Sequence, residues 1–127
     1  MIDHSGISVL DFDASRLFYE LALAPLGASL LHEVPLEFTG GVRVVGYGRD
    51  RPTFWINEGG AQYPALHIAF VAQSRTQVKA FYYAALKAGA KDNGAPGLRP
   101  HYHEHYYGAF VLDFDGNNIE AVCHTPL

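Results

Sequence analysis

Three residues of this chain have side chains of the types that bind divalent metal ions. Glu120 lies in the middle of an apolar, β-prone stretch near the end of the sequence. A carboxylate inside a buried strand is costly unless it is paired or holds a metal. Two histidines, His4 and His67, stand at the start of other predicted strands. Two neutral imidazoles and one carboxylate on one side of a metal leave its other side open to a substrate.

The elements that must position these residues follow from the hydrophobic pattern. Helical spacing follows a predicted N-cap at Asp11 and continues to about residue 25. A second helix is predicted to begin at Ser74, which forms a capping box with Gln77. This helix is predicted to end near Gly89. The segment with Gly94, Pro96, Gly97 and Pro100 is expected to be a loop. Strands are predicted over residues 2–9, 29–33, 42–47, 53–57, 66–71, 106–112 and 119–123.

The sequence repeats itself at an offset of 63 positions. His4 corresponds to His67, the predicted cap Asp11 corresponds to Ser74, and the pair Phe-Tyr at positions 18–19 recurs at positions 81–82. A repeat of half the chain indicates a two-fold pseudosymmetric sheet rather than a solenoid, which needs at least about three units. The predicted fold is therefore α+β, with a βαβββ module over about residues 1–60 and another over about 64–127, together forming one domain over residues 1–127.

The end of the chain carries the most specific motif. Positions 113–120 read Asp-Phe-Asp-Gly-Asn-Asn-Ile-Glu, a turn followed by the start of a strand. Together with the duplication and the histidine in each first strand, this motif resembles the vicinal oxygen chelate superfamily, which includes glyoxalase I, bleomycin resistance proteins, extradiol dioxygenases and fosfomycin-modifying thiol transferases. The resemblance implies tandem βαβββ modules that form a curved open-barrel cleft (the glyoxalase/dioxygenase fold), commonly in a homodimer. It also implies that His4, His67 and Glu120 bind Fe, Mn, Ni, Co or Zn.

The implied activity is that of a small metal-dependent enzyme. Lyase or isomerase chemistry on a small oxygenated metabolite is the first expectation, with Glu120 as both ligand and catalytic residue. An extradiol-type dioxygenase is an alternative, as is a bleomycin-resistance-like protein that sequesters a small molecule without turnover. Aligning the last strands of the two modules places Phe54 opposite Glu120, where enzymes resembling glyoxalase I have a carboxylate. The three-ligand members therefore fit this pattern better.

A histidine-rich segment precedes the strand predicted over residues 106–112. In an extended chain, alternating His101, His103 and His105 would share one face and could bind zinc. A solvated loop is the favoured interpretation. In the superfamily this loop borders the cleft, which implies that Tyr102, His105 or Tyr107 could hydrogen-bond the substrate or carry a proton.

The amino-acid composition limits which classes of partner and which cellular location are expected. The formal net charge is -4 and no run of lysine or arginine occurs, which argues against nucleic acid or an anionic membrane as the main partner. The single cysteine, Cys123, cannot form an internal disulfide, and no signal peptide or membrane span is apparent, so a cytoplasmic location is expected. The partner is expected to be a small-molecule substrate. Cationic candidates for binding an anionic substrate are Arg43, Arg49, Arg51 and Arg99.

Overall fold

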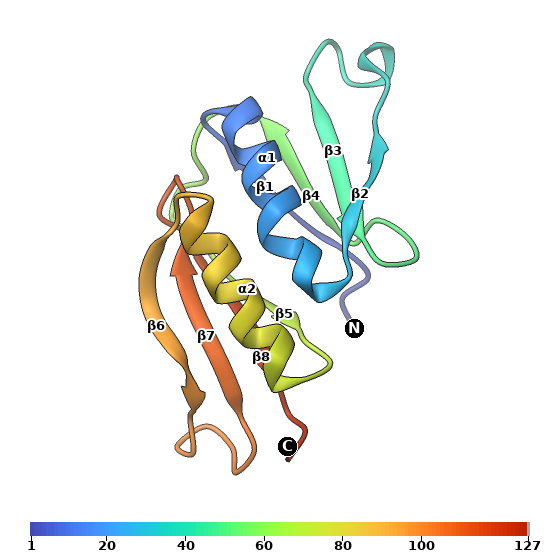
Figure 1. Ribbon diagram of the computed structural model, residues 1–127. Coiled ribbons are helices and arrows are strands. Elements are labelled where there is room, and N and C mark those ends of the chain that lie inside the picture. Colours follow the sequence, from blue (N-terminus) through green and yellow to red (C-terminus); the bar gives the residue numbers. More distant parts are fainter. Residues whose placement is uncertain (127) are drawn as a thin grey trace.

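The computed structural model describes residues 1–126, which form two modules with the same order of elements (Figure 1). The first module comprises β1 (Ser5–Val9), α1 (Phe12–Leu23), the 3-10 turn η1 (Ala24–Leu26), β2 (Ser29–Glu33), the 3-10 turn η2 (Leu36–Phe38), β3 (Val44–Gly48) and β4 (Phe54–Glu58). The second comprises β5 (His67–Val71), α2 (Arg75–Lys87), β6 (Lys91–Leu98), β7 (Tyr107–Leu112) and β8 (Asn118–Cys123). The predicted α+β class and the repeated βαβββ order are confirmed.

Each module builds its own four-stranded mixed sheet. The strand orders are β1-β4-β3-β2 and β5-β8-β7-β6. In each sheet the first strand runs parallel to the last strand of the module, and the remaining pairs are antiparallel. The parallel registers are equivalent, because Gly6 lies opposite Trp55 in one sheet and Ala69 lies opposite Glu120 in the other. The duplication is thus visible at the level of individual residue pairs.

Both helices begin at the predicted caps. The side chain of Asp11 accepts a hydrogen bond from the Ala14 amide at 3.1 Å, and Ser74 Oγ accepts one from the Gln77 amide at 3.1 Å. Each bond satisfies an amide that has no partner within the helix. Neither α1 nor α2, the α-helices of residues 1–126, is long and apolar enough to cross a membrane.

The two helices pack against each other and cover one face of the sheets (Figure 1). The modules are also joined by polar contacts, since the Tyr19 hydroxyl donates to Asp113 and the Leu10 amide donates to Asp115. Alternate strand residues enter the hydrophobic core on the helix side. They are Ile7, Val9, Val45, Tyr47, Phe54 and Ile56 in the first sheet and Tyr107, Ala109, Val111, Ile119, Ala121 and Cys123 in the second. The intervening residues project from the face that carries no helix.

The loop expected around Gly94 is the edge strand β6, so that prediction was wrong. The strand pairs with β7 through two register shifts, between Asp92 and Gly94 and between Gly94 and Gly97. Gly94 has φ +147°, and a Cβ there would lie 3.0 Å from the Phe110 ring. Glycine and proline are tolerated at bulges and edges, so the features that suggested a loop are compatible with this strand.

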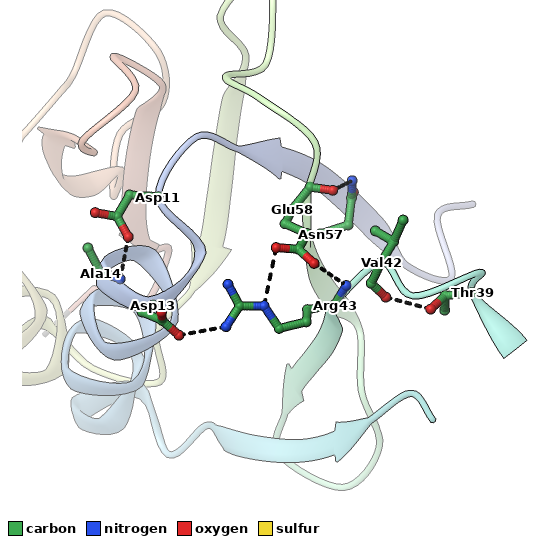
Figure 2. Close-up of polar contacts among 8 residues, drawn as sticks. All are labelled: Asp11, Asp13, Ala14, Thr39, Val42, Arg43, Asn57 and Glu58. Carbon is green, nitrogen blue, oxygen red and sulfur yellow. Dashed lines mark hydrogen bonds and ion pairs between the residues drawn. The ribbon is translucent and has the colours of Figure 1, made fainter. Parts of the chain in front are cut away.

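Arg43 links three segments of the first module through hydrogen bonds and ion pairs. Arg43 donates from its amide to Oε1 of Glu58 at 2.9 Å and from Nε to Oε2 at 3.2 Å, and its Nη1 lies 2.8 Å from Asp13 of α1 (Figure 2). The amide of Arg43, followed by its guanidinium, holds the pKa of Glu58 below its ordinary value. One side chain thus connects β4, the approach to β3 and the first turn of α1.

Candidate functional site

Glu120 is fully buried although it projects from the sheet face that no helix covers. Its neighbours Ile119 and Ala121 enter the core beneath α2, and alternation along β8 directs Glu120 to the opposite side. Two groups reach its carboxylate. Nε2 of His67 lies 2.7 Å from Oε1, and the Tyr106 hydroxyl donates a hydrogen bond to Oε2. Each oxygen of this buried carboxylate is therefore contacted by a different residue, one at the start of β5 and one just before β7.

His67 forms the accessible side of this pair. It is the first residue of β5, which runs parallel and adjacent to β8, so both side chains project from the same face. The side chain of His67 is 54% exposed, whereas that of Glu120 is 1% exposed. A small molecule approaching this face would meet the imidazole first and the carboxylate behind it.

Tyr106 was not singled out from the sequence, although it makes the second contact to Glu120. Its ring packs against Tyr102, with centroids 5.0 Å apart, and against His124, with centroids 5.3 Å apart. Burial, followed by its hydrogen bond to Glu120, raises the pKa of the Tyr106 hydroxyl. A Cβ at Gly108 would lie 3.2 Å from the Tyr106 ring and 3.4 Å from Glu120 Oε2, so this glycine leaves room for both groups.

His4 lies apart from the other two predicted ligands. It precedes β1, its side chain is 62% exposed, and Nδ1 lies 2.8 Å from Asp3. Asp3 is also 3.2 Å from Arg51, and the bond to His4, followed by the charge of Arg51, lowers the pKa of Asp3. Within residues 1–126 no three His, Cys, Asp or Glu side chains are grouped closely enough to hold a metal ion. A single chain therefore brings two of the three predicted ligands together.

The chemistry of the His67 and Glu120 pair fits a divalent metal. The two facing atoms are His67 Nε2 and Glu120 Oε1, which lie 2.7 Å apart, and both are atoms of the kind that bind metals. Tyr106 contacts the other carboxylate oxygen, so it would leave Oε1 available to the metal. The donor set is one imidazole and one carboxylate, which suits Fe, Mn, Ni, Co or Zn.

The position equivalent to Glu120 in the first module is Trp55. The registers that place Gly6 opposite Trp55 and Ala69 opposite Glu120 establish this equivalence, which differs by one residue from the alignment that selected Phe54. Phe54 instead enters the core, where its ring contacts Tyr19. Trp55 has no carboxylate, and its indole cannot ligate a metal. The first module therefore contributes no ligand at this position.

The histidine-rich segment forms turns between β6 and β7 rather than an extended strand. Tyr102 is exposed and reaches Glu120 only through Tyr106. His105 lies 3.7 Å from Glu104, and none of the hydrogen bonds or ion pairs within residues 1–126 joins it to His67 or Glu120. Tyr107 faces the core. Tyr102 and His105, which were predicted to serve in catalysis, therefore make no direct contact with Glu120 or His67. Tyr106 does contact Glu120.

The sequence profile of the glyoxalase/bleomycin resistance protein/dioxygenase superfamily matches residues 1–121. The chain belongs to this superfamily. No curated protein sequence matches it. Among solved structures, a glyoxalase/bleomycin resistance protein from Albidiferax ferrireducens T118 is 25% identical, with a TM-score of 0.74 over 98% of this chain and 99% of that one.

Two more distant superfamily structures share the fold. A mutant of the fosfomycin resistance protein FosX from Listeria monocytogenes, complexed with Mn(II) and 1S,2S-dihydroxypropylphosphonic acid, is 16% identical, with a TM-score of 0.70 over 98% of this chain and 90% of that one. A mutant of glyoxalase I from Zea mays is 22% identical, with a TM-score of 0.69 over 97% of this chain and 46% of that one.

Proposed function

We propose that this chain is a metal-dependent enzyme that acts on a small molecule with two adjacent oxygens, by lyase or isomerase chemistry. The observation that supports it is the buried carboxylate of Glu120 beside the accessible imidazole of His67. The bound metal would act as a Lewis acid that polarises a substrate oxygen. His67 and Glu120 would hold it, and Tyr106 would fix the orientation of Glu120 through its second oxygen. Buried Cys123, the single cysteine, accords with a cytoplasmic enzyme.

We further propose that a second copy of the chain completes the site. His4 is exposed and lies near the edge strand β1, while His67 begins the edge strand β5. Both sheets leave one face without a helix, so a homodimer could place His4 of one copy near His67 and Glu120 of the other. The third ligand then comes from a chain that a monomer does not contain.

Metal content tests this proposal. Protein purified without chelators or a histidine tag is expected to hold about one Fe, Mn, Ni, Co or Zn per chain by elemental analysis. The variants His67→Ala, Glu120→Gln and His4→Ala are expected to lose it. His101→Ala removes an exposed imidazole outside the pair and serves as the control. Wild-type protein that neither contains nor takes up any of these metals would rule out the enzyme function.

A mixing experiment tests the shared site. If His4 acts across the interface, a heterodimer of His4→Ala and Glu120→Gln chains contains one intact ligand set. Refolding the two variants together should then restore about a quarter of the wild-type metal content, the share expected from random pairing. Unchanged loss of metal in the mixture would place all ligands within one chain.

A cavity supports the non-catalytic alternative. About 330 Å³ in volume, it lies where the modules meet and is lined by Leu23, Leu26, Tyr47, Phe54, Phe70 and Val71, with Arg49 and Arg51 also in its wall. This volume is at the lower end of small-molecule sites. Stoichiometric binding of a small molecule by metal-free protein, without product, would favour a sequestering protein.

A further inference from the structure

Arg99 lies on the same face of the second sheet as the His67 and Glu120 pair. Its guanidinium carbon is 5.3 Å from the centre of the Phe110 ring, and that ring is 6.2 Å from the ring of His67. Phe110 is also the direct partner of Glu120 across β7 and β8, so its side chain projects from the same face. The guanidinium of Arg99 thus packs on a residue of strand β7 that lies beside the candidate metal site.

The guanidinium of Arg99 is fixed in place by backbone groups. Nη1 donates to the Gly97 carbonyl at 2.9 Å, and Nη2 donates to the Ala95 carbonyl at 2.8 Å. A Cβ at Gly94 would lie 3.2 Å from Nη2, and one at Gly97 would lie 3.2 Å from Nη1. The glycines that bend β6 therefore also leave space for the guanidinium. A cation ordered in advance loses little freedom when it binds an anion.

Within the described part of the chain, the charge of Arg99 is not balanced by an ion-paired carboxylate. Three other arginines form ion pairs, which join Arg16 to Glu33, Arg43 to Asp13 and Glu58, and Arg51 to Asp3. Across residues 1–126 no ion pair involves Arg99. Its two hydrogen bonds to carbonyls leave other donors of the five in a guanidinium. These donors and the uncompensated charge suit the oxygens of a carboxylate or a phosphate group.

We infer that Arg99 forms an anion subsite, and that the substrate carries a carboxylate or phosphate group in addition to its adjacent oxygens. The inference rests on the proposed function, because it takes the metal at His67 and Glu120 as the second point of attachment. Arg99 would select the substrate and orient it from one side, while Phe110 provides an apolar wall between the two attachment points. Of the four arginines suggested by the sequence, it is the one beside the pair.

A matched pair of probes tests the subsite. Both 3,4-dihydroxybenzoate and 3,4-dihydroxybenzamide present adjacent oxygens, but only the first carries an anionic group. Their affinities for Mn(II)-loaded protein are measured by calorimetry, and the ratio of the two affinities is compared between variants. In Arg99→Gln the preference for the benzoate should fall about tenfold or more, the value of one charge-assisted hydrogen bond. Arg99→Lys should retain part of the preference.

Arg16→Gln is the control, because Arg16 belongs to α1 and forms its ion pair with Glu33 of β2, so both residues lie in the first module. Its ratio should match the wild type, and metal content should be the same in all variants. An equal ratio in wild type and Arg99→Gln would overturn the inference while leaving the metal site intact. Should Arg99→Gln fail to fold, a wild-type preference that is insensitive to salt and to Arg99→Lys would overturn it. Failure of both probes to bind would overturn the proposed function, and the subsite with it.

Discussion

At the level of single residues, Glu120 determines what the second module can do. Without a metal its carboxylate is buried and depends on His67 and Tyr106 for hydrogen bonds. Removing a carboxylate from water costs free energy, which its hydrogen-bond partners must offset. The carboxylate of Glu120 is therefore a strong acceptor that a cation could bind, and it lies behind the solvent-accessible imidazole of His67.

Replacing Tyr106 with phenylalanine tests how the carboxylate is positioned. The ring contacts to Tyr102 and His124 remain, while the hydrogen bond to Glu120 is lost. Partners that orient a ligand typically change metal affinity by about 10- to 100-fold, so Tyr106→Phe should weaken Mn(II) binding by that amount in a calorimetric titration. Tyr102→Phe, which keeps the ring that packs on Tyr106, should bind Mn(II) as the wild type does. Equal affinity in the two variants would remove Tyr106 from the site.

The sequence identified Glu120 and His67 because charged or imidazole side chains interrupt apolar strands. It selected Tyr107 instead of Tyr106, because both belong to the same predicted strand and differ only in the face to which they point. The register with β8 resolves this, since Phe110 lies opposite Glu120 and Tyr106 is an even number of residues away. Counting alternate residues back from the partner of Glu120 would have found it.

At the level of elements, β4 and β8 are equivalent strands that carry different side chains on the face without a helix. Trp55 and Glu120 occupy the same register position. The indole lies against Gly46 of β3, where a Cβ would approach the ring to 2.8 Å. The first sheet therefore has an aromatic side chain at the position where the second has a carboxylate.

The link between β4 and α1 gives stability that depends on pH. The pKa of Glu58 is lowered from its ordinary 4.5, first by the Arg43 amide and then by its guanidinium. A lowered folded-state pKa stabilises the fold above the unfolded value, and this contribution is lost as pH falls through the folded value. Wild-type protein should therefore lose more stability than Glu58→Gln between about pH 5 and the acid range, measured by urea unfolding at each pH. Parallel curves for the two proteins would mean that the bond has no net effect.

Element prediction succeeded where caps and periodicity agreed, as at Asp11 and Ser74. It failed at β6, because glycine and proline mark both loops and bulged edge strands. The distinction depends on whether a neighbouring strand supplies hydrogen bonds, and local sequence does not contain that information. β7 supplies them here.

At the level of the whole molecule, the modules are held together by their helices and by the bond from Tyr19 to Asp113. Asp113 also accepts bonds from the amides of Asp115 and Asn117, so one buried carboxylate joins α1 to the turn before β8. Burial, followed by the charge of Asp113, raises the pKa of the Tyr19 hydroxyl and keeps it protonated as a donor.

Tyr19→Phe removes this donor and keeps the ring. Because hydrogen bonds to charged groups are worth about 1.5–3 kcal/mol, the free energy of unfolding should fall by that amount in urea titrations. Tyr83→Phe changes an exposed tyrosine of α2 and should leave stability within about 0.5 kcal/mol of the wild type. A Tyr19→Phe protein as stable as Tyr83→Phe would show that the bond from Tyr19 to Asp113 adds nothing to the docking of the modules.

The duplication was visible in the sequence, but the placement of one module against the other was not. A repeat register shows that two halves share a fold, and it does not show which faces meet. His4 and His67 match at an offset of 63, and the chain nevertheless packs so that His4 bonds Asp3 rather than Glu120. Docking depends on contacts such as that of Tyr19 with Asp113, whose partners lie 94 positions apart.

Trp55 has an optical consequence. It is the single tryptophan of the chain, it is partly exposed on the face that no helix covers, and the ring of His32 lies 6.0 Å from its own. Its ultraviolet emission therefore arises from one known place on the first sheet, with no other indole to dilute the signal. Any molecule that covers this face and displaces water from the indole shifts the emission to shorter wavelengths. The protein thus carries its own fluorophore at the surface where a partner is expected, and association can be followed without a label.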